Sequence, residues 1–174
     1  MDKKLNGEIS RSLIKGLFDY HEDGYLIWKI RPCRNVKIGD KAGCLIKYKN
    51  AYRYVIRINK KNYFASRLIF LWHPGWLPTI VDHENHITID NRIKNLRDAN
   101  SSDNNKNRTS RKDSTSKYLG VSITKKYQYC VARIKVDGKN KHLGTFKSEA
   151  TAALAYNEAA SLHFGKFANL NIIV

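Results

Sequence analysis

The chain has 174 residues, of which 32 are Lys or Arg and 15 are Asp or Glu, so its formal net charge is +17. This length suits one medium domain or two small ones. The longest apolar run, 68–72, is far shorter than the roughly 20 residues of a membrane helix, and the N-terminus has no signal-peptide core. We therefore expect a cytoplasmic protein without a membrane partner.

The excess of positive charge indicates a polyanionic partner, and nucleic acid is the usual one. Tyrosines alternate with basic residues in 47–63, KYKNAYRYVIRINKKNY, and no amphipathic helix with a bulky apolar face accompanies them. This favours nucleic acid over an anionic membrane, and a merely soluble basic protein is the plain alternative. The three cysteines are widely spaced, which argues against a disulfide framework or a zinc knuckle.

The first part of the chain predicts a helix, several strands and a second helix. Apolar residues recur at helical spacing in 9–18. Runs rich in Tyr, Ile and Val, separated by turn-forming residues, predict strands at 24–30, 43–49, 51–58 and 61–67. We expect a hairpin turn about Asn59–Lys61. The short apolar segment 65–72 is predicted to be a helix that HPGWLP ends.

The next segment combines an Asp-His pair with many asparagines, which suit neither a core nor a helix. We expect a strand at 79–83 that carries Asp82 and His83, a return strand at 95–99, and a helix that starts within 101–108. A histidine with a pKa near neutrality can act as a base, and carboxylate and amide oxygens suit Mg²⁺. A polar pair that is simply satisfied at a strand end is the alternative.

The segment 106–116 is polar and basic, and it separates this part from a second domain. Three strands are predicted at 117–125, 127–136 and 141–146, with an Asp-Gly hairpin turn at 137–140. A helix is predicted over 148–165, with Ser148 as its N-cap and Gly165 at its end. Alternation along the second strand directs Ala132, Ile134 and Val136 toward this helix, and Arg133 and Lys135 away from it.

The stretch from Val81 resembles the HNH endonucleases with a ββα-metal fold, especially the phage and homing enzymes. The motifs that carry the resemblance are VDH, DNRIKNLR and NNKNR, and the segment upstream of them is also similar. The resemblance implies that His83 is the general base and that Asp82 and Asn104 are metal ligands. It implies that Asn95 holds the His-bearing loop in place, while we expect Asn91 to cap a turn.

Three positions depart from the pattern of that family. Ser66 stands where a His often precedes the Arg, and we assign it no role. Asn104 stands where many members have His. An Asn at this place occurs in a phage subgroup, and its side chain keeps an oxygen available for a hard cation. His86 stands where Gly is frequent, and we interpret it as a bystander, with a phosphate contact or a substitute base as alternatives. The implied cofactor is Mg²⁺ or Mn²⁺, and the implied catalytic residues are His83, Asn95 and Asn104.

The segment 116–171 resembles the APETALA-type, or ethylene-response-factor, DNA-binding domain, a three-stranded antiparallel sheet packed on one helix. The motifs are YLGV, ARI, HLGTF, EATAALAYNEAA and FGKFANLN. Ser122 and Cys130 depart from the plant pattern, so we expect a different sequence preference. The residues that this resemblance and the alternation place on the DNA side are Lys125, Lys126, Arg133, Lys135 and His142; solvated side chains or phosphate contacts alone are the alternative.

Together these features predict an α+β protein with an HNH nuclease domain over 1–109, a basic linker over 110–116 and an APETALA-type domain over 117–174. The expected function is metal-dependent hydrolysis of phosphodiester bonds in double-stranded DNA, with no obligate protein partner. A DNA-binding transcriptional regulator without catalysis is the main alternative. A basic RNA-binding protein would explain the charge but not the Asp-His-Asn set.

Overall fold

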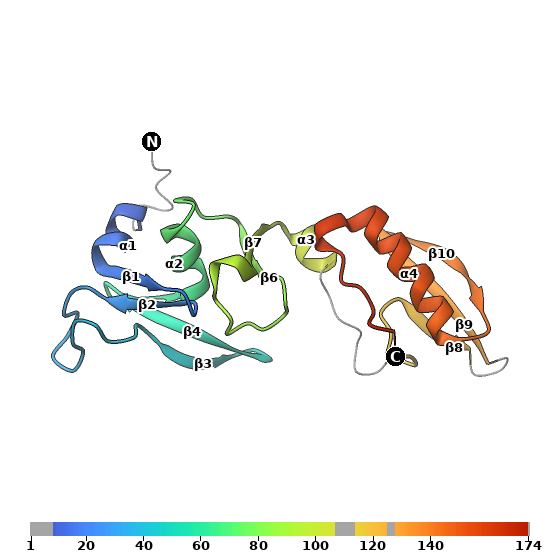
Figure 1. Cartoon of the computed structure of the whole chain (residues 1–174), viewed down its shortest axis with the longest axis horizontal. Helices are drawn as coiled ribbons and strands as arrows, with labels where there is room; N and C mark the ends of the chain where they lie inside the picture. The colour runs from blue at the N-terminus through green and yellow to red at the C-terminus, as the bar shows by residue number, and fades with distance from the viewer. Residues whose placement is uncertain (1–8, 107–113, 125–127, 174) are drawn as a thin grey trace. The chain divides into compact units, whose positions relative to one another are not determined.

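The computed structural model describes residues 9–106, 114–124 and 128–173, apart from a few side chains in 102–105. These residues form an α+β protein with small antiparallel sheets, in agreement with the predicted fold class (Figure 1). The chain divides into an N-terminal unit, 1–100, and a C-terminal unit, 101–174. None of the described helices has the length and apolar character needed to cross a membrane.

The N-terminal unit begins with a short helix that leads directly into a hairpin. α1 (Arg11–Leu17) starts after Ser10, whose hydroxyl accepts a hydrogen bond from the backbone N–H of Leu13. This is the N-cap arrangement that satisfies a donor of the first turn. β1 (Phe18–His21) then pairs with β2 (Tyr25–Trp28) in an antiparallel hairpin.

The second sheet of this unit has the strand order β3-β4-β5. Its strands are β3 (Cys44–Tyr48), β4 (Ala51–Ile58) and β5 (Lys61–Phe64). Asn59 and Lys60 join β4 to β5 with φ values of 47° and 66°. Two successive positive φ values are typical of the type I′ turn, so the predicted hairpin is confirmed.

α2 (Ala65–Trp72) lies against the core of the N-terminal unit and buries most of its residues. Its neighbours in that core come mainly from α1, β1, β2 and β4, and Leu96 is also part of the cluster. The largest fully buried side chains of this cluster are Phe18, Ile14, Leu26, Ile56, Leu68 and Ile69. Burying a side chain of this size stabilises a fold by about 1.5–3 kcal/mol relative to exposure. The core therefore holds the two hairpins and α2 together.

The segment with the Asp-His pair forms a two-stranded antiparallel sheet. β6 (Ile80–His83) pairs with β7 (Leu96–Ala99), and a loop followed by the 3₁₀ turn η1 (Ile93–Asn95) connects them. α3 (Ser101–Lys106) comes next and belongs to the C-terminal unit, where it contacts η2 (Gly165–Phe167). Strand, strand and helix therefore follow one another along the chain in the predicted order.

The C-terminal unit is a three-stranded antiparallel sheet of order β10-β9-β8 with one long helix packed on it. The strands are β8 (Val121–Thr124), β9 (Tyr129–Val136) and β10 (Lys139–Phe146), and the helix is α4 (Glu149–Phe164). The alanines of α4 at 152, 153 and 160 are fully buried, so the helix lies close to the sheet. The caps predicted for this helix at its two ends are confirmed.

The sequence missed one strand and placed several residues in the wrong kind of element. The predicted helix 9–18 included Phe18, which belongs to β1, and the predicted strand 61–67 included 65–67, which belong to α2. β1 was not predicted, because Phe-Asp-Tyr-His is too short and too mixed in polarity to stand out as a strand. Asn95 was placed in a strand, but it ends the 3₁₀ turn before β7. The predicted linker, 110–116, overlaps the residues 107–113, which lie outside the described part of the chain.

Candidate active site and nucleic-acid interface

Asp82 and His83 are neighbouring polar residues at the end of β6, and both are buried. Their exposed fractions are 7% and 5%. β6 is only four residues long and pairs with β7, where Arg97 faces Asp82 and Leu96 faces His83. Buried polar groups need hydrogen-bond partners, because an unsatisfied group retains the cost of its lost hydration. The partners of these two residues define the site.

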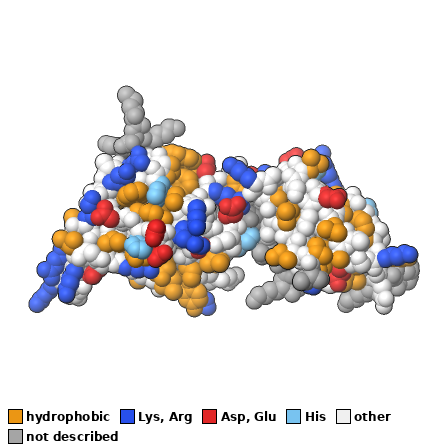
Figure 2. Space-filling model, in the orientation of Figure 1, with side chains coloured by type: hydrophobic (Ala, Val, Ile, Leu, Met, Phe, Trp, Pro, Cys, Tyr) orange, Lys and Arg blue, Asp and Glu red, His pale blue; other side chains and the backbone are white. Residues whose placement is uncertain are grey.

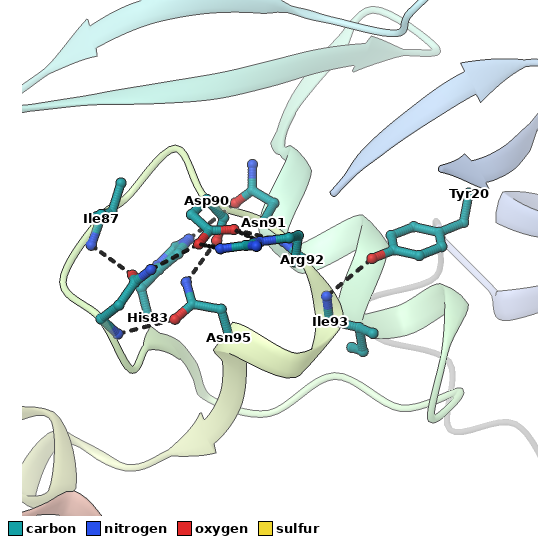
Figure 3. Close-up of polar contacts among 9 residues, drawn as sticks. Tyr20, His83, Ile87, Asp90, Asn91, Arg92, Ile93 and Asn95 are labelled. Carbon is teal, nitrogen blue, oxygen red and sulfur yellow. Dashed lines mark hydrogen bonds and ion pairs between the residues drawn. The ribbon is translucent and has the colours of Figure 1, made fainter. Parts of the chain in front are cut away.

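The side chain of His83 is held by Asn91. The ring Nε2–H of His83 donates to Oδ1 of Asn91 over 3.0 Å, and Asn91 is only 2% exposed (Figure 3). An amide oxygen only accepts hydrogen bonds, so the neutral ring carries its proton on Nε2 and its lone pair on Nδ1. The prediction that Asn91 caps a turn is wrong, because its side chain is buried against the histidine.

The surroundings of His83 favour the neutral imidazole. Burial lowers the pKa of His83, and the positive charge of Arg53 on β4 lowers it further. The hydrogen bond with Asn91 and the carboxylates of Asp82 and Asp90 oppose this shift without overcoming it. A histidine with a lowered pKa is neutral near pH 7 and is therefore able to accept a proton.

The carboxylate of Asp82 is oriented by an arginine on the adjacent strand. Nε of Arg97 donates to Oδ2 of Asp82 over 2.9 Å, and Nη1 of Arg97 lies 3.6 Å from Oε1 of Glu84. The side chains of Arg97 and Asp82 are 14% and 8% exposed, so the Asp82 pair is shielded from water. The sequence singled out Asp82 but not Arg97, because their contact follows from the pairing of β6 with β7.

Asn95 connects the two ends of the loop that follows His83. Its Oδ1 accepts from the backbone N–H of Asn85 over 3.0 Å, and its Nδ2 donates to the carbonyl oxygen of Asp90 over 2.8 Å (Figure 3). The backbone N–H of Glu84 also donates to the carbonyl oxygen of Asn95. These contacts hold the loop closed, which is the arrangement that the predicted role of Asn95 requires.

Asp90 and Arg92 form a second link within this loop that the sequence did not predict. Nε and Nη2 of Arg92 donate to the two carboxylate oxygens of Asp90 over 2.8 and 2.6 Å, and Nδ2 of Asn85 donates to the same carboxylate over 2.8 Å. The bonds from Arg92 hold the pKa of Asp90 well below its usual range. The tripeptide Asp90-Asn91-Arg92 was the feature of the sequence that could have indicated this link, since each of its side chains makes a hydrogen bond within the loop or to His83.

His86 lies in the same loop with φ at 62°, a left-handed conformation that favours glycine. A glycine at this position would adopt the same conformation without strain. We expect His86→Gly to leave DNA cleavage unchanged and to change the free energy of unfolding by less than about 1 kcal/mol, because relief of strain offsets the entropy of the more flexible unfolded chain. Plasmid cleavage and urea denaturation measure the two quantities, and a large loss of cleavage would show that the imidazole participates.

Few of the described side chains near His83 could coordinate a metal ion. No group of three or more His, Cys, Asp or Glu residues that could hold a metal ion occurs among the residues that the structure describes. Asp82 supplies one buried carboxylate, and Asn104 lies on α3 with its side chain outside the description. Mg²⁺ often binds through only one or two protein oxygens and keeps several waters. The N-terminal unit therefore offers a magnesium ion one buried carboxylate, that of Asp82.

The outer face of the C-terminal sheet carries the basic residues that the alternation predicted. Ala132 and Ile134 are buried beneath α4, while Arg133, Lys135 and His142 are exposed. Arg133 on β9 pairs with His142 on β10, so the two lie side by side. Lys and Arg side chains occur on both units in Figure 2. The other two predicted DNA contacts, Lys125 and Lys126, lie outside the described residues.

The candidate site thus consists of a buried Asp-His pair at the end of β6, a closed loop that holds the histidine ring, and a separate basic sheet face. Each part is defined by contacts among residues of a single unit. Comparison of the chain with protein-family models, with curated proteins and with solved structures found no match.

Proposed function

We propose that the chain is a metal-dependent DNA endonuclease of the HNH type, in which the N-terminal unit hydrolyses a phosphodiester bond and the C-terminal sheet binds duplex DNA. The observation that carries this proposal is the buried His83 ring, oriented by Asn91 and adjacent to the carboxylate of Asp82. A polar pair with only a packing role would not require the loop beside it to be held closed by hydrogen bonds of the side chains of Asn85 and Asn95. The order strand, loop, strand, helix along the chain from β6 to α3 supports this proposal, because a ββα-metal motif has the same order in sequence.

His83 is the general base in this proposal. Its Nε2–H is directed at Asn91, so Nδ1 takes the proton from the attacking water. The lowered pKa keeps the ring neutral before the reaction. Asn95 and the Asp90–Arg92 pair hold the loop, and they thereby maintain the orientation of the ring relative to the phosphate.

Asp82 would bind the Mg²⁺ or Mn²⁺ ion from the N-terminal unit, and Asn104 is the second ligand that the resemblance to the HNH enzymes implies. When bound, such an ion stabilises the negative charge that develops on the phosphate and on the departing oxygen. Arg97 fixes the orientation of the carboxylate of Asp82 through the 2.9 Å hydrogen bond. Arg97 is therefore expected to contribute to the site without being a ligand.

The experiment that tests the function is incubation of supercoiled plasmid with the protein and Mg²⁺, followed by the same reaction with EDTA. We expect conversion to the nicked or linear form only with the divalent cation. Plasmid that binds the protein but stays intact, over a range of plasmids with different sequences, would contradict the nuclease and support a DNA-binding regulator. Preferential binding of RNA would contradict both.

The outer face of the C-terminal sheet is expected to supply much of the DNA affinity. Arg133→Ala and Lys135→Ala should each weaken binding and lower the slope of log K against log salt concentration by about 0.9, because each removes one phosphate contact. Lys147→Ala, which removes the same charge at an exposed position after β10, is the control and should have less effect. Fluorescence anisotropy at several salt concentrations measures the slopes, and equal slopes for all three variants would contradict this role.

A further inference from the structure

The turn of the β1–β2 hairpin presses against the backbone of the loop that holds His83. Gly24 in this turn has φ at +84°. A Cβ atom built on Gly24 would lie 2.3 Å from the backbone nitrogen of Arg92 and 2.5 Å from the carbonyl carbon of Asn91. Both distances are far below any van der Waals contact, and both neighbours are backbone atoms that cannot rotate away. Only glycine permits the hairpin to approach Asn91 and Arg92 this closely.

The same hairpin also makes a hydrogen bond to this segment. The hydroxyl oxygen of Tyr20, on β1, accepts from the backbone N–H of Ile93 over 3.1 Å (Figure 3). The ring of Tyr20 is itself held by edge contact with His73, at a centroid distance of 4.4 Å. Tyr20 and Gly24 thus contact residues on either side of Arg92 from a hairpin that lies about 70 residues earlier in the chain.

We propose that the β1–β2 hairpin is a positioning element for the catalytic histidine, acting through Gly24 and Tyr20 on the Asn91–Ile93 backbone and through the Asn91 side chain on the His83 ring. The catalytic part of this inference rests on the proposed function, whereas the positioning part rests on contacts alone. The buried side chain of Asn91 accepts the hydrogen bond from His83, and the backbone of Asn91 lies against Gly24. Displacement of this backbone therefore moves the acceptor of the Nε2–H bond.

The proposal is tested with Gly24→Ala against a matched control, Gly39→Ala. Gly39 has φ at +92°, nearly the same conformation, but nothing lies within 4 Å of the position that its Cβ would take. Both substitutions therefore impose left-handed backbone strain, and only the first displaces Asn91 and Arg92. The control for Tyr20→Phe is Tyr25→Phe, which also removes a hydroxyl group from this hairpin. The ring of Tyr25 stacks on His21.

We expect Gly24→Ala to lower kcat for plasmid cleavage by about 10²-fold, the cost of displacing a catalytic group by about 1 Å. Tyr20→Phe should lower it by roughly 2- to 10-fold, the equivalent of one hydrogen bond. Gly39→Ala and Tyr25→Phe should change it by less than about 2-fold at temperatures where all four variants are folded. Equal losses for Gly24→Ala and Gly39→Ala would overturn the proposal.

A second measurement separates this inference from the proposed function. The ring signals of His83 are recorded by NMR in the full chain of each variant at a single pH. We expect the chemical shifts of the His83 ring to change in Gly24→Ala and to match the parent chain in Gly39→Ala, whether or not the protein cleaves DNA, because only the first substitution moves the hydrogen-bond acceptor of the ring. In an Asn91→Ala background the effect of Gly24→Ala on kcat and on these chemical shifts should disappear, since the two residues act in series. Additive effects, or an unchanged His83 signal in a folded Gly24→Ala protein, would overturn the proposal.

Discussion

Replacing His83 with alanine is expected to lower the rate of DNA cleavage by about 10²- to 10⁴-fold, the usual contribution of a general base, and to leave DNA affinity nearly unchanged. The reason is that His83 is 5% exposed and oriented by Asn91, whereas the exposed basic residues of the C-terminal sheet belong to the other unit. Single-turnover cleavage and anisotropy with the same oligonucleotide measure the two quantities.

Two further observations make the result for His83 decisive. Added imidazole should restore part of the lost rate in His83→Ala, because the small molecule can occupy the emptied position and accept the proton. In the parent protein the rate should rise with pH through a midpoint below 6.5, since burial and Arg53 lower the pKa of His83. His86→Ala is the control for a histidine in the same loop. A fully active His83→Ala variant would exclude His83 as the base.

Replacing Asp82 with asparagine is expected to lower the cleavage rate by about 10³-fold and to raise the Mg²⁺ concentration needed for half-maximal rate. The substitution keeps the size of the side chain but removes the negative charge that would bind the cation. It also breaks the ion pair with Arg97, whose side chain is only 14% exposed, so the midpoint of thermal unfolding should fall. Mg²⁺ titration of the cleavage rate and calorimetry measure these effects.

The matched control for Asp82→Asn is Asp98→Asn on the neighbouring strand β7. Asp98 is exposed and pairs in register with Val81, next to Asp82, so its substitution removes the same charge from the same two-stranded sheet. We expect Asp98→Asn to cleave with the Mg²⁺ dependence of the parent protein. If Asp82→Asn shows that same dependence at an undiminished rate, then Asp82 is not a metal ligand and the Asp82–Arg97 pair has a structural role alone.

The elements of this protein were largely predictable because their signals are local. The strand β4 was predicted with its observed ends, and the turns at Asn59–Lys60 and at 137–138 contain Asn, Asp and Gly, which adopt positive φ more readily than other residues. The inward and outward faces of β9 followed from alternation alone. β1 was missed because its four residues have no periodicity of their own, and they become a strand only by pairing with β2.

The candidate site shows the same division between local and distant information. The sequence alone determined that Asp82 and His83 are adjacent at a strand end and that Arg133 and Lys135 share an outer face, because each of these depends on neighbours in the chain. Only the tertiary structure decided which amide holds His83, which arginine holds Asp82, and that Gly24 lies against Asn91. These contacts join segments that are apart in sequence, and they exist only when strand pairing and core packing bring the backbones together.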